Sequence, residues 1–514
     1  MVRHNEVIRD DYRSGGPIDF LVVGAGLSGL QVAKDLSKLG MKNVWVLEAG
    51  PNLGLEHTYW EHDVKHAQEL WQLLRNDPSF HRAWISQSEP HYSGASGLRR
   101  RLGGRSLYWH GAVIRLEPWA LNPVDWPAAI VRDLSEGVDG NPSFYEAQES
   151  EVEIQVPTPG TQLAVSILQA AGYERAKAVP LAVRYSQSLS YHSRWAAYSP
   201  LDYWRQTLEQ GAHDEVESLP KIACNTEVLS LLHNGGKVSG AKARNRMTGE
   251  VTNIPCRHIV LAAGTIENTH LVLDALIAEG TIERPEIHGL MDHLVVGCLF
   301  RVRLSSVPHE WNSVEIPSFG YIPGNADTRF NLFVSITRSD LDNHALLIDI
   351  WAMGEQLRGY GNTVSIDPGS TVKRSIFVSA GLSKLDHKLI ELEQEAVIEL
   401  SKHLLHELGV SSFLVDTKLP SSSPVVGDFA QALRNTLGST ATISNPSVYI
   451  SPLGTVDHEG GTLPFGSFLN DYGELYYLRG LYAVGPCTFP RMGAANPSLT
   501  TLALAKRTAF HLSL

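Results

Sequence analysis

The feature that most constrains this chain is a glycine-rich turn that joins an apolar segment to an amphipathic one near the N-terminus. Residues 19–23 (DFLVV) are predicted to form a strand, and the next six residues read G-x-G-x-x-G. The three glycines are Gly24, Gly26 and Gly29. A helix is expected to follow, and a second apolar strand, residues 44–47, ends at Glu48. This order is that of a complete dinucleotide-binding βαβ unit, here about residues 19–51.

Each part of this unit has a physical reason. Gly24 permits the tight turn after the strand, and Gly26 allows the backbone to approach a pyrophosphate. Gly29 lets the helix pack closely against the strand. The helix N-terminus then faces the phosphates, because its first N–H groups have no partners within the helix. Glu48 stands where such units carry the carboxylate that accepts hydrogen bonds from the ribose hydroxyls.

The length and charge of the chain limit its organisation and its partners. At 514 residues it is too long for one compact core, so two domains or one elaborated domain are expected. The formal net charge of −12 argues against a nucleic-acid partner and against anionic membranes. This charge is compatible with a cationic small molecule, but plain surface acidity is the favoured interpretation.

The cysteines and the N-terminal residues bear on the compartment. Four scattered cysteines with no C-x-x-C pair predict neither a disulfide framework nor a zinc site, and no metal site is predicted. The first residues lack the apolar core of a signal peptide, and no uninterrupted apolar stretch of about 18 residues occurs. We therefore expect a cytoplasmic protein without a membrane segment.

Two later segments are predicted to return the chain to the nucleotide-binding sheet. Residues 258–263 form an apolar strand that ends at Gly264, and a helix is expected from Thr265. Residues 481–484 form a similar apolar strand, and another helix is expected from Pro497. Both passages have the strand-to-helix order of the first unit, so the nucleotide domain is predicted to contain the first, middle and last parts of the chain.

The pattern elsewhere is different. Residues 299–304 and 345–350 alternate between apolar and polar, which predicts an antiparallel sheet, and a helix is expected at about 388–408. Residues 56–100 are predicted to be mainly helical, and residues 1–18 to form a loose polar arm.

Together these patterns predict an α/β protein, α+β overall, with a Rossmann-like nucleotide-binding domain and an inserted antiparallel-sheet substrate domain. The nucleotide-binding domain is expected over residues 1–296, with helical insertions, and again over 456–514. The substrate domain is expected over 297–455. A nucleotide domain assembled in this way from separate parts of the chain is typical of flavoproteins.

Four short motifs extend this interpretation: residues 103–106 (GGRS), 263–267 (AGTIE), 458–466 (HEGGTLPFG) and 495–500 (ANPSLT). With the βαβ unit, they resemble the glucose-methanol-choline (GMC) flavin oxidoreductases along nearly the whole chain. The likeness is greatest to the sugar-oxidising branch, which includes pyranose oxidase-like and glycoside-oxidising enzymes. The resemblance implies FAD as cofactor. It also implies transfer of a hydride from an alcohol carbon to flavin N5 while a histidine takes the hydroxyl proton.

The resemblance assigns catalytic roles to His458 and Asn496. His458 would be the general base, since an imidazole has a pKa near neutrality, and Asn496 would be its partner on the substrate hydroxyl. It also implies that FAD is bound by Gly24, Gly26, Leu27, Ser28, Gly29, Glu48, Gly103, Gly104, Ser106, Val228, Ala263, Gly264, Gly485, Asn496, Pro497 and Ser498.

Several of these residues have a structural alternative. An Asn before a Pro is a common start of a helix, so Asn496 could cap the helix that follows it. Asp292 and His293, in a short motif near the expected domain junction, are interpreted as a structural hydrogen-bonded pair, with direct catalysis as the alternative.

The segment around the second glycine turn leaves further alternatives open. Tyr108 stands where some members of the family carry a histidine bonded covalently to the flavin, and His110 lies two positions later, so non-covalent binding is expected. Tyr108 and Trp109 could line the pocket or belong to the core. The basic run 99–101 could bind phosphate, anchor the turn or lie on a solvated face.

The function predicted from the sequence is oxidation of a CH–OH group of a sugar or sugar-like alcohol. The acidic balance favours an amino sugar or aminoglycoside intermediate, with a neutral glycoside as the competitor. Oxygen or another acceptor would reoxidise the flavin, and the oligomeric state is left open. The rival functions are a flavin-containing lyase or decarboxylase on the same fold and a non-catalytic dinucleotide-binding protein.

Overall fold

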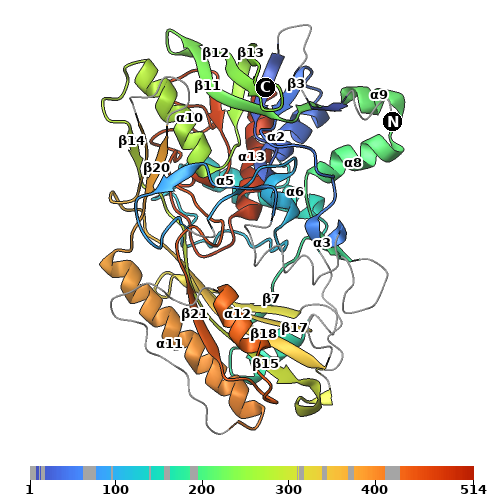
Figure 1. The fold of residues 1–514 in the computed structure, drawn as a ribbon, viewed down its shortest axis with the longest axis vertical. Coiled ribbons are helices and arrows are strands. Elements are labelled where there is room, and N and C mark those ends of the chain that lie inside the picture. The colour runs from blue at the N-terminus through green and yellow to red at the C-terminus, as the bar shows by residue number, and fades with distance from the viewer. Residues whose placement is uncertain are drawn as a thin grey trace.

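The computed structural model describes most of the chain. The described residues are 7–10, 12, 18–61, 77–93, 96–137, 140–154, 162–185, 195–309, 311, 318–338, 344–367, 375–410 and 429–514. Figure 1 shows two sheet-based halves along the long axis of the molecule. The upper half contains the helices α2 (Leu27–Lys38), α10 (Thr265–Ala278) and α13 (Ser498–Leu512), and the lower half contains the long helix α11 (Lys384–Glu407).

The upper half is built on a mixed sheet with a parallel centre. Its strands lie in the order β1 (Ile8–Arg9), β10 (Lys221–Ala223), β3 (Val44–Leu47), β2 (Ile18–Val23), β13 (Val251–Leu261), β12 (Lys237–Asn245) and β11 (Thr226–Asn234), and β22 (Leu481–Ala483) pairs with β13. The central strands β2 and β3 are almost wholly buried. Nearly continuous apolar runs of this kind are expected where helices cover both faces of a parallel sheet.

This topology brings three distant parts of the chain to one edge of the sheet. β2 pairs in parallel with β3 and with β13, and β13 pairs in parallel with β22. The carboxyl ends of these strands therefore meet, and the residues that follow them gather there. These residues are Gly24, Glu48, Gly264 and Gly485. The two predicted returns to the sheet are confirmed.

The lower half is built on an antiparallel sheet. Its strands lie in the order β21 (Ser447–Ser451), β15 (His293–Arg303), β18 (Ala345–Glu355), β17 (Phe330–Arg338), β16 (Ser318–Ile322) and β7 (Lys177–Ala178). The long helix α11 packs on β15 and β18, and it begins with a capping box formed by Ser383 and Asp386. The predicted alternating strands and the helix near 388–408 are confirmed, while the domain boundaries 296/297 and 455/456 stay a prediction.

Smaller elements surround these two sheets. A second antiparallel group contains β14 (Glu286–His288), β19 (Thr363–Ile366) and β20 (Ile376–Ser379), with β5 (Trp84–Ser86) parallel to β20. Two short pairs are β4 (Phe80–His81) with β6 (Leu98–Arg99) and β8 (Val183–Tyr185) with β9 (Trp195–Ala197). The other α-helices among the described residues are α3 (Thr58–Glu61), α5 (Ala128–Ser135), α6 (Phe144–Glu151), α7 (Leu163–Ala170), α8 (Leu201–Gln210), α9 (His213–Ser218) and α12 (Phe429–Leu437).

Two local predictions are wrong for the residues that the structure describes. Within 56–100, the described residues contain only the short helix α3, and the described part from residue 77 onward contains the strands β4, β5 and β6; residues 62–76 lie outside the described part. These strands are held by partners distant in sequence, such as β20, which override local helix propensity. In the N-terminal arm, Ile8–Arg9 form an edge strand paired with β10, and Ile8 is buried.

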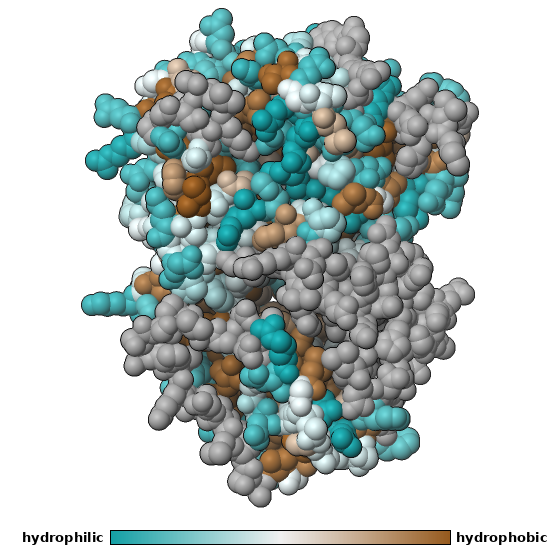
Figure 2. Space-filling view, in the orientation of Figure 1, coloured by the Kyte–Doolittle hydropathy of each residue, from teal (hydrophilic) through white to brown (hydrophobic). Residues whose placement is uncertain are grey.

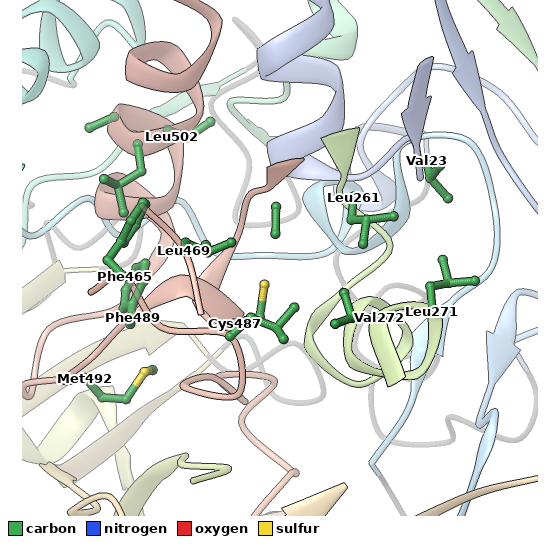
Figure 3. Packing of buried hydrophobic residues seen from close by; sticks show 14 of the residues in the cluster. Val23, Leu261, Leu271, Val272, Phe465, Leu469, Cys487, Phe489, Met492 and Leu502 are labelled. Atoms are coloured by element: carbon green, nitrogen blue, oxygen red, sulfur yellow. The ribbon is translucent and has the colours of Figure 1, made fainter. Parts of the chain in front are cut away.

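The hydrophobic core joins the first, middle and last parts of the chain. Figure 3 shows side chains from β2, β13, α10, the segment 465–492 and α13 in one cluster. The labelled members are Val23, Leu261, Leu271, Val272, Phe465, Leu469, Cys487, Phe489, Met492 and Leu502. Each large apolar side chain buried there contributes about 1.5–3 kcal/mol. The C-terminal segment is therefore an integral part of the nucleotide-binding half.

The surface is mixed in character. On the face shown in Figure 2, hydrophobic residues form small separate groups among hydrophilic ones. Within the described part of the chain, no helix combines the length and the apolar character needed to cross a bilayer.

Candidate active site

A cavity lies at the edge of the parallel sheet where the strand ends meet. It is lined by the catalytic candidates His458 and Asn496 and by most of the predicted cofactor residues. These cofactor residues are Gly24, Gly26, Leu27, Ser28, Glu48, Gly104, Ser106, Val228, Ala263, Gly264, Gly485, Pro497 and Ser498. Residues from eight separate segments of the sequence thus share one cavity.

Gly29 and Gly103 do not line the cavity, and their roles are structural. A Cβ atom on Gly29 would lie 2.0 Å from the carbonyl oxygen of Gly24, so only glycine lets α2 approach the turn this closely. Gly103 has a φ of +89°, and its N–H donates to the carbonyl of Ala25 at 2.9 Å. The second glycine turn is therefore fastened onto the first.

The end of the cavity at α2 has the features of a phosphate site. No side chain caps the N-terminus of α2. A Cβ atom on Gly26 would meet no heavy atom within 4 Å, so the backbone there borders open space. Free N–H groups at a helix N-terminus attract anions. These residues fit the pyrophosphate of a dinucleotide.

Glu48 is buried and is held by the backbone of the glycine turn. Its Oε2 accepts a hydrogen bond from the N–H of Ala25 at 3.0 Å, and its Oε1 accepts one from the N–H of Gly50 at 2.7 Å. Burial raises the pKa of Glu48 to about 7, against the opposing effect of these two hydrogen bonds. Each carboxylate oxygen keeps a second lone pair, so the group still has acceptors for ribose hydroxyls.

His458 is positioned by an ion-pair clamp on its two neighbours in sequence. Arg105, from the second glycine turn, donates to both carboxylate oxygens of Glu459 at 3.0 and 2.6 Å. Its Nη1 also lies 3.0 Å from the Oδ1 of Asp457. Asp457 has a φ of +60°, a conformation that Asp tolerates better than most residues. Arg105 thus fixes the backbone on both sides of the imidazole.

The electrostatic surroundings keep His458 neutral. Burial lowers the pKa of His458 well below its ordinary value, and the nearby His293 and the cation of Arg105 lower this pKa further. Because a neutral imidazole carries one unprotonated nitrogen, His458 has a free lone pair at neutral pH.

A short antiparallel contact brings His293 beside His458. The N–H groups of Met291 and Gly460 donate to each other's carbonyl oxygens, at 3.0 and 2.8 Å. His293 lies two residues after Met291 and His458 lies two residues before Gly460, so this antiparallel register places the two histidines opposite each other. Their Nδ1 atoms are 2.8 Å apart. The expected pair of Asp292 with His293 also exists, but through the backbone: Oδ1 of Asp292 accepts the N–H of His293 at 2.7 Å.

Asn496 lines the cavity just before α13. That helix begins at Ser498 with Pro497 at the N-cap position, and no side chain caps it. The alternative that the Asn496 side chain caps this helix is therefore not supported, and the amide is left available to the cavity.

The aromatic residues after the second glycine turn combine both roles proposed for them. Tyr108 is buried, lines the cavity, and has its hydroxyl 3.1 Å from the Oγ of Ser79. Trp109 also lines the cavity, while its Nε1 donates to the carbonyl of Tyr198 at 2.8 Å. His110 lines the cavity and is exposed.

The three arginines of the basic run 99–101 have different positions: two line the cavity, and the third binds the backbone of a neighbouring loop. Arg99 and Arg100 line the cavity, and the Nε of Arg99 lies 3.2 Å from the Oδ2 of Asp77. Arg101 donates to the carbonyl of Gly54 at 3.1 Å, so it anchors the turn.

Metal ligands are not a feature of this cavity within the described residues. Among the described residues, the group that could hold a metal ion is His213, Asp214 and Glu217, which are exposed on α9 and do not line the cavity. Exposed acidic groups of this kind are common without an ion.

Sequence reasoning missed the roles of two residues at this site. The motif gave Arg105 no function of its own, and the interpretation of His293 as a partner of Asp292 did not include its contact with His458. No local pattern relates Arg105 to Glu459 or His293 to His458, because these pairs are separated by 354 and 165 positions.

Comparisons with known proteins bear on the fold. No family model matches the chain. A short stretch of 78 residues, 15% of this chain and 12% of the other protein, is 35% identical to Dehydrogenase xptC from Emericella nidulans, so the match spans a small part of that protein. Among solved structures, pyridoxine 4-oxidase from Mesorbium loti matches with a TM-score of 0.65 and 17% identity, over 96% of this chain and 99% of that chain.

The structural match confirms the predicted fold. This chain has the mixed α/β architecture of pyridoxine 4-oxidase, with a Rossmann-like parallel sheet and a separate antiparallel sheet. The fold expected from the resemblance to the GMC oxidoreductases is therefore present. The sugar-oxidising branch and the activity itself stay predictions.

Proposed function

We propose that this protein is an FAD-dependent oxidoreductase that oxidises a CH–OH group of a small alcohol. The observation that carries this proposal is that the glycine turn and His458 line the same cavity, and that the imidazole of His458 is neutral there. The fold of pyridoxine 4-oxidase supports it, as does the short similarity to a dehydrogenase.

The residues present fit FAD along the length of the cavity. Gly26 and the N-terminus of α2 would hold the pyrophosphate, and Glu48 would accept from the ribose. The uncapped N-terminus of α13, near Asn496, would face the flavin ring and favour negative charge on it. When bound, FAD supplies the hydride acceptor at flavin N5.

The protein's own residues would handle the proton and the position of the substrate. The substrate hydroxyl would donate a hydrogen bond to His458 and accept one from the amide of Asn496. His458 would then take the hydroxyl proton, since an alcohol is a poor hydride donor until that proton leaves. General-base assistance of this kind contributes about 10²–10⁴-fold to a rate.

The proposal extends to the class of substrate. A sugar or sugar-like alcohol follows from the resemblance of the sequence, and the net charge of −12 favours an amino sugar over a neutral glycoside. Pyridoxine, the substrate in the name of the structural match, is an alcohol of a different class. Oxygen or another acceptor would complete the cycle.

Anaerobic mixing with a panel of alcohols tests the proposal. The panel contains neutral glycosides, amino sugars, aminoglycoside intermediates and pyridoxine, and the measurement is loss of the flavin absorbance. Bleaching by one class, with formation of the matching carbonyl compound, supports the oxidoreductase and names its substrate. Conversion of a substrate without net flavin reduction would favour a lyase or decarboxylase. No response to any alcohol, with FAD bound, would favour a non-catalytic dinucleotide-binding protein.

We expect the purified protein to be yellow and to release FAD when it is precipitated with acid. The reason is that Tyr108, at the position of the covalent histidine in some flavoproteins, has its hydroxyl in contact with Ser79. Mass spectrometry of the supernatant should find FAD. Colour that stays with the pellet would instead assign a covalent bond, first to His110, and release of FMN or NAD alone would contradict the cofactor.

Two glycine variants separate cofactor binding from folding. In Gly26→Ala the new methyl group meets open space in the protein, so thermal stability of the apoprotein should not change, but the group would stand where the pyrophosphate approaches. We expect FAD affinity to fall by roughly 10-fold or more, measured by titration of the apoprotein.

Gly29→Ala is the matched control. Its methyl group would collide with the Gly24 carbonyl, so we expect the apoprotein itself to lose about 1–3 kcal/mol of stability. Equal effects of the two variants on apoprotein stability would contradict the assignment of Gly26 to the phosphate site.

A further inference from the structure

His293 is buried at the start of β15, and both of its ring nitrogens have partners. Its Nε2 lies 3.0 Å from the carbonyl oxygen of Gly493, and its Nδ1 lies 2.8 Å from the Nδ1 of His458. A carbonyl oxygen can only accept a hydrogen bond, so Nε2 of His293 carries the hydrogen and donates it. In a neutral His293, Nδ1 is then the acceptor.

The neutral state of His293 follows from its surroundings. Burial lowers its pKa to about 4, against the smaller opposing effect of the Gly493 carbonyl. The carboxyl group of Asp292 accepts hydrogen bonds from the N–H groups of His293 and Gly454 and from the hydroxyl of Tyr92. The charge facing the histidine pair from the glycine turn is the cation of Arg105, which opposes a second positive charge.

The Gly493 carbonyl is itself held in place by buried carboxylates. The N–H of Gly493 donates to Oε1 of Glu355 at 3.0 Å, and Arg491 binds both oxygens of Glu355 at 2.8 and 3.0 Å. The next N–H, that of Ala494, donates to Glu117 at 3.1 Å. Glu355 lies opposite His293 on the neighbouring strand β18. The antiparallel sheet therefore positions both His293 and the carboxylate that holds Gly493.

From this chain of donors we infer that His293 is a positioning residue that fixes the tautomer of His458. The hydrogen on Nε2 of His293 makes its Nδ1 an acceptor, and Nδ1 of His458 must therefore donate. Nε2 of His458 is then the nitrogen with a free lone pair. In the proposed reaction, on which the catalytic part of this inference rests, the O–H bond of the substrate breaks and an Nε2–H bond forms on His458. The Nδ1–H···Nδ1 hydrogen bond to His293 is kept throughout.

Nitrogen NMR of the resting protein tests the tautomer without any substrate. The cofactor-loaded protein is labelled with ¹⁵N-histidine, and the His293 and His458 signals are assigned by their loss in single variants. We expect His458 to show a protonated Nδ1 and an unprotonated Nε2, and His293 to show the reverse. A protonated Nε2 on neutral His458, or a doubly protonated His293, would overturn the inference. This outcome does not depend on which alcohol, if any, the protein oxidises.

Two variants of His293 then test the consequence for the rate. In His293→Asn the amide oxygen can take the place of the accepting Nδ1, whereas His293→Leu removes the acceptor from a side chain of similar bulk. We expect His293→Leu to give mixed His458 tautomers and to slow flavin reduction about 10²-fold, because a histidine in the wrong tautomer cannot act as the base. His293→Asn should retain the Nδ1–H tautomer and recover most of the rate.

If His293→Leu does not fold, His293→Asn and the unmodified protein still decide the matter. Loss of the His458 tautomer in a folded His293→Asn, or full activity in a folded His293→Leu, would contradict the assigned role. A panel in which no alcohol reduces the flavin, together with the expected NMR pattern, would refute the proposed function and leave the tautomer assignment standing.

Discussion

We expect His458→Ala to abolish alcohol-dependent flavin reduction while the protein still binds FAD. The variant removes the imidazole that is held neutral beside the cavity, and the glycine turns and Glu48 are untouched. Loss of a general base costs about 10²–10⁴-fold in rate, so the rate constant for flavin reduction should fall at least about 10²-fold. Anaerobic stopped-flow absorbance measures this constant, and the visible spectrum reports the bound flavin.

A histidine far from the cavity provides the matched control for this variant. His406 lies exposed in the last turn of α11, and His406→Ala should reduce its flavin at the rate of the unmodified protein. If flavin reduction in His458→Ala stays within a few-fold of that control, the base is another residue. If His458→Ala lost FAD, the missing cofactor and not the missing base would explain its slow rate. Retention of the flavin spectrum is therefore part of the expected result.

We expect Asn496→Asp to keep its thermal stability and to lose most of its flavin-reduction activity. The side chain does not cap α13, and a carboxylate near a helix N-terminus interacts favourably with the helix dipole. An ionised Asp cannot donate a hydrogen bond to the substrate oxygen, and its negative charge would oppose the alkoxide that develops as His458 takes the proton. Loss of one such donor costs about 10²–10³-fold. Unfolding midpoints and stopped-flow rates of the same preparation measure the two effects separately.

Asn496→Ser distinguishes the loss of a hydrogen-bond donor from the gain of a negative charge. Serine keeps a donor without a charge, so its rate should lie between those of the unmodified protein and Asn496→Asp. A rate in Asn496→Asp that falls only in step with its stability would assign Asn496 a structural role. The partner of His458 on the substrate would then have to be another group that lines the cavity.

The local pattern of the sequence was sufficient to predict the fold of the nucleotide-binding unit. An apolar run, three glycines at defined spacing and an acid at the end of the next strand each express a requirement of the backbone within a few residues. The same holds for the returns at Gly264 and Gly485 and for the long helix α11, whose apolar period is carried by its own residues. These features depend on chain geometry that operates over short distances, so the sequence predicts them directly.

Tertiary structure decided which side chains meet at the candidate base. The contact of Met291 with Gly460 sets a register that places His293 against His458, and the clamp from Arg105 to Glu459 reaches across 354 positions. The strands within 77–100 also depend on partners far along the chain. Whether a ring nitrogen donates or accepts depends on the atom opposite it, and only the folded chain determines that atom. The motif therefore predicted the histidine, and the fold determined which atom faces its Nδ1.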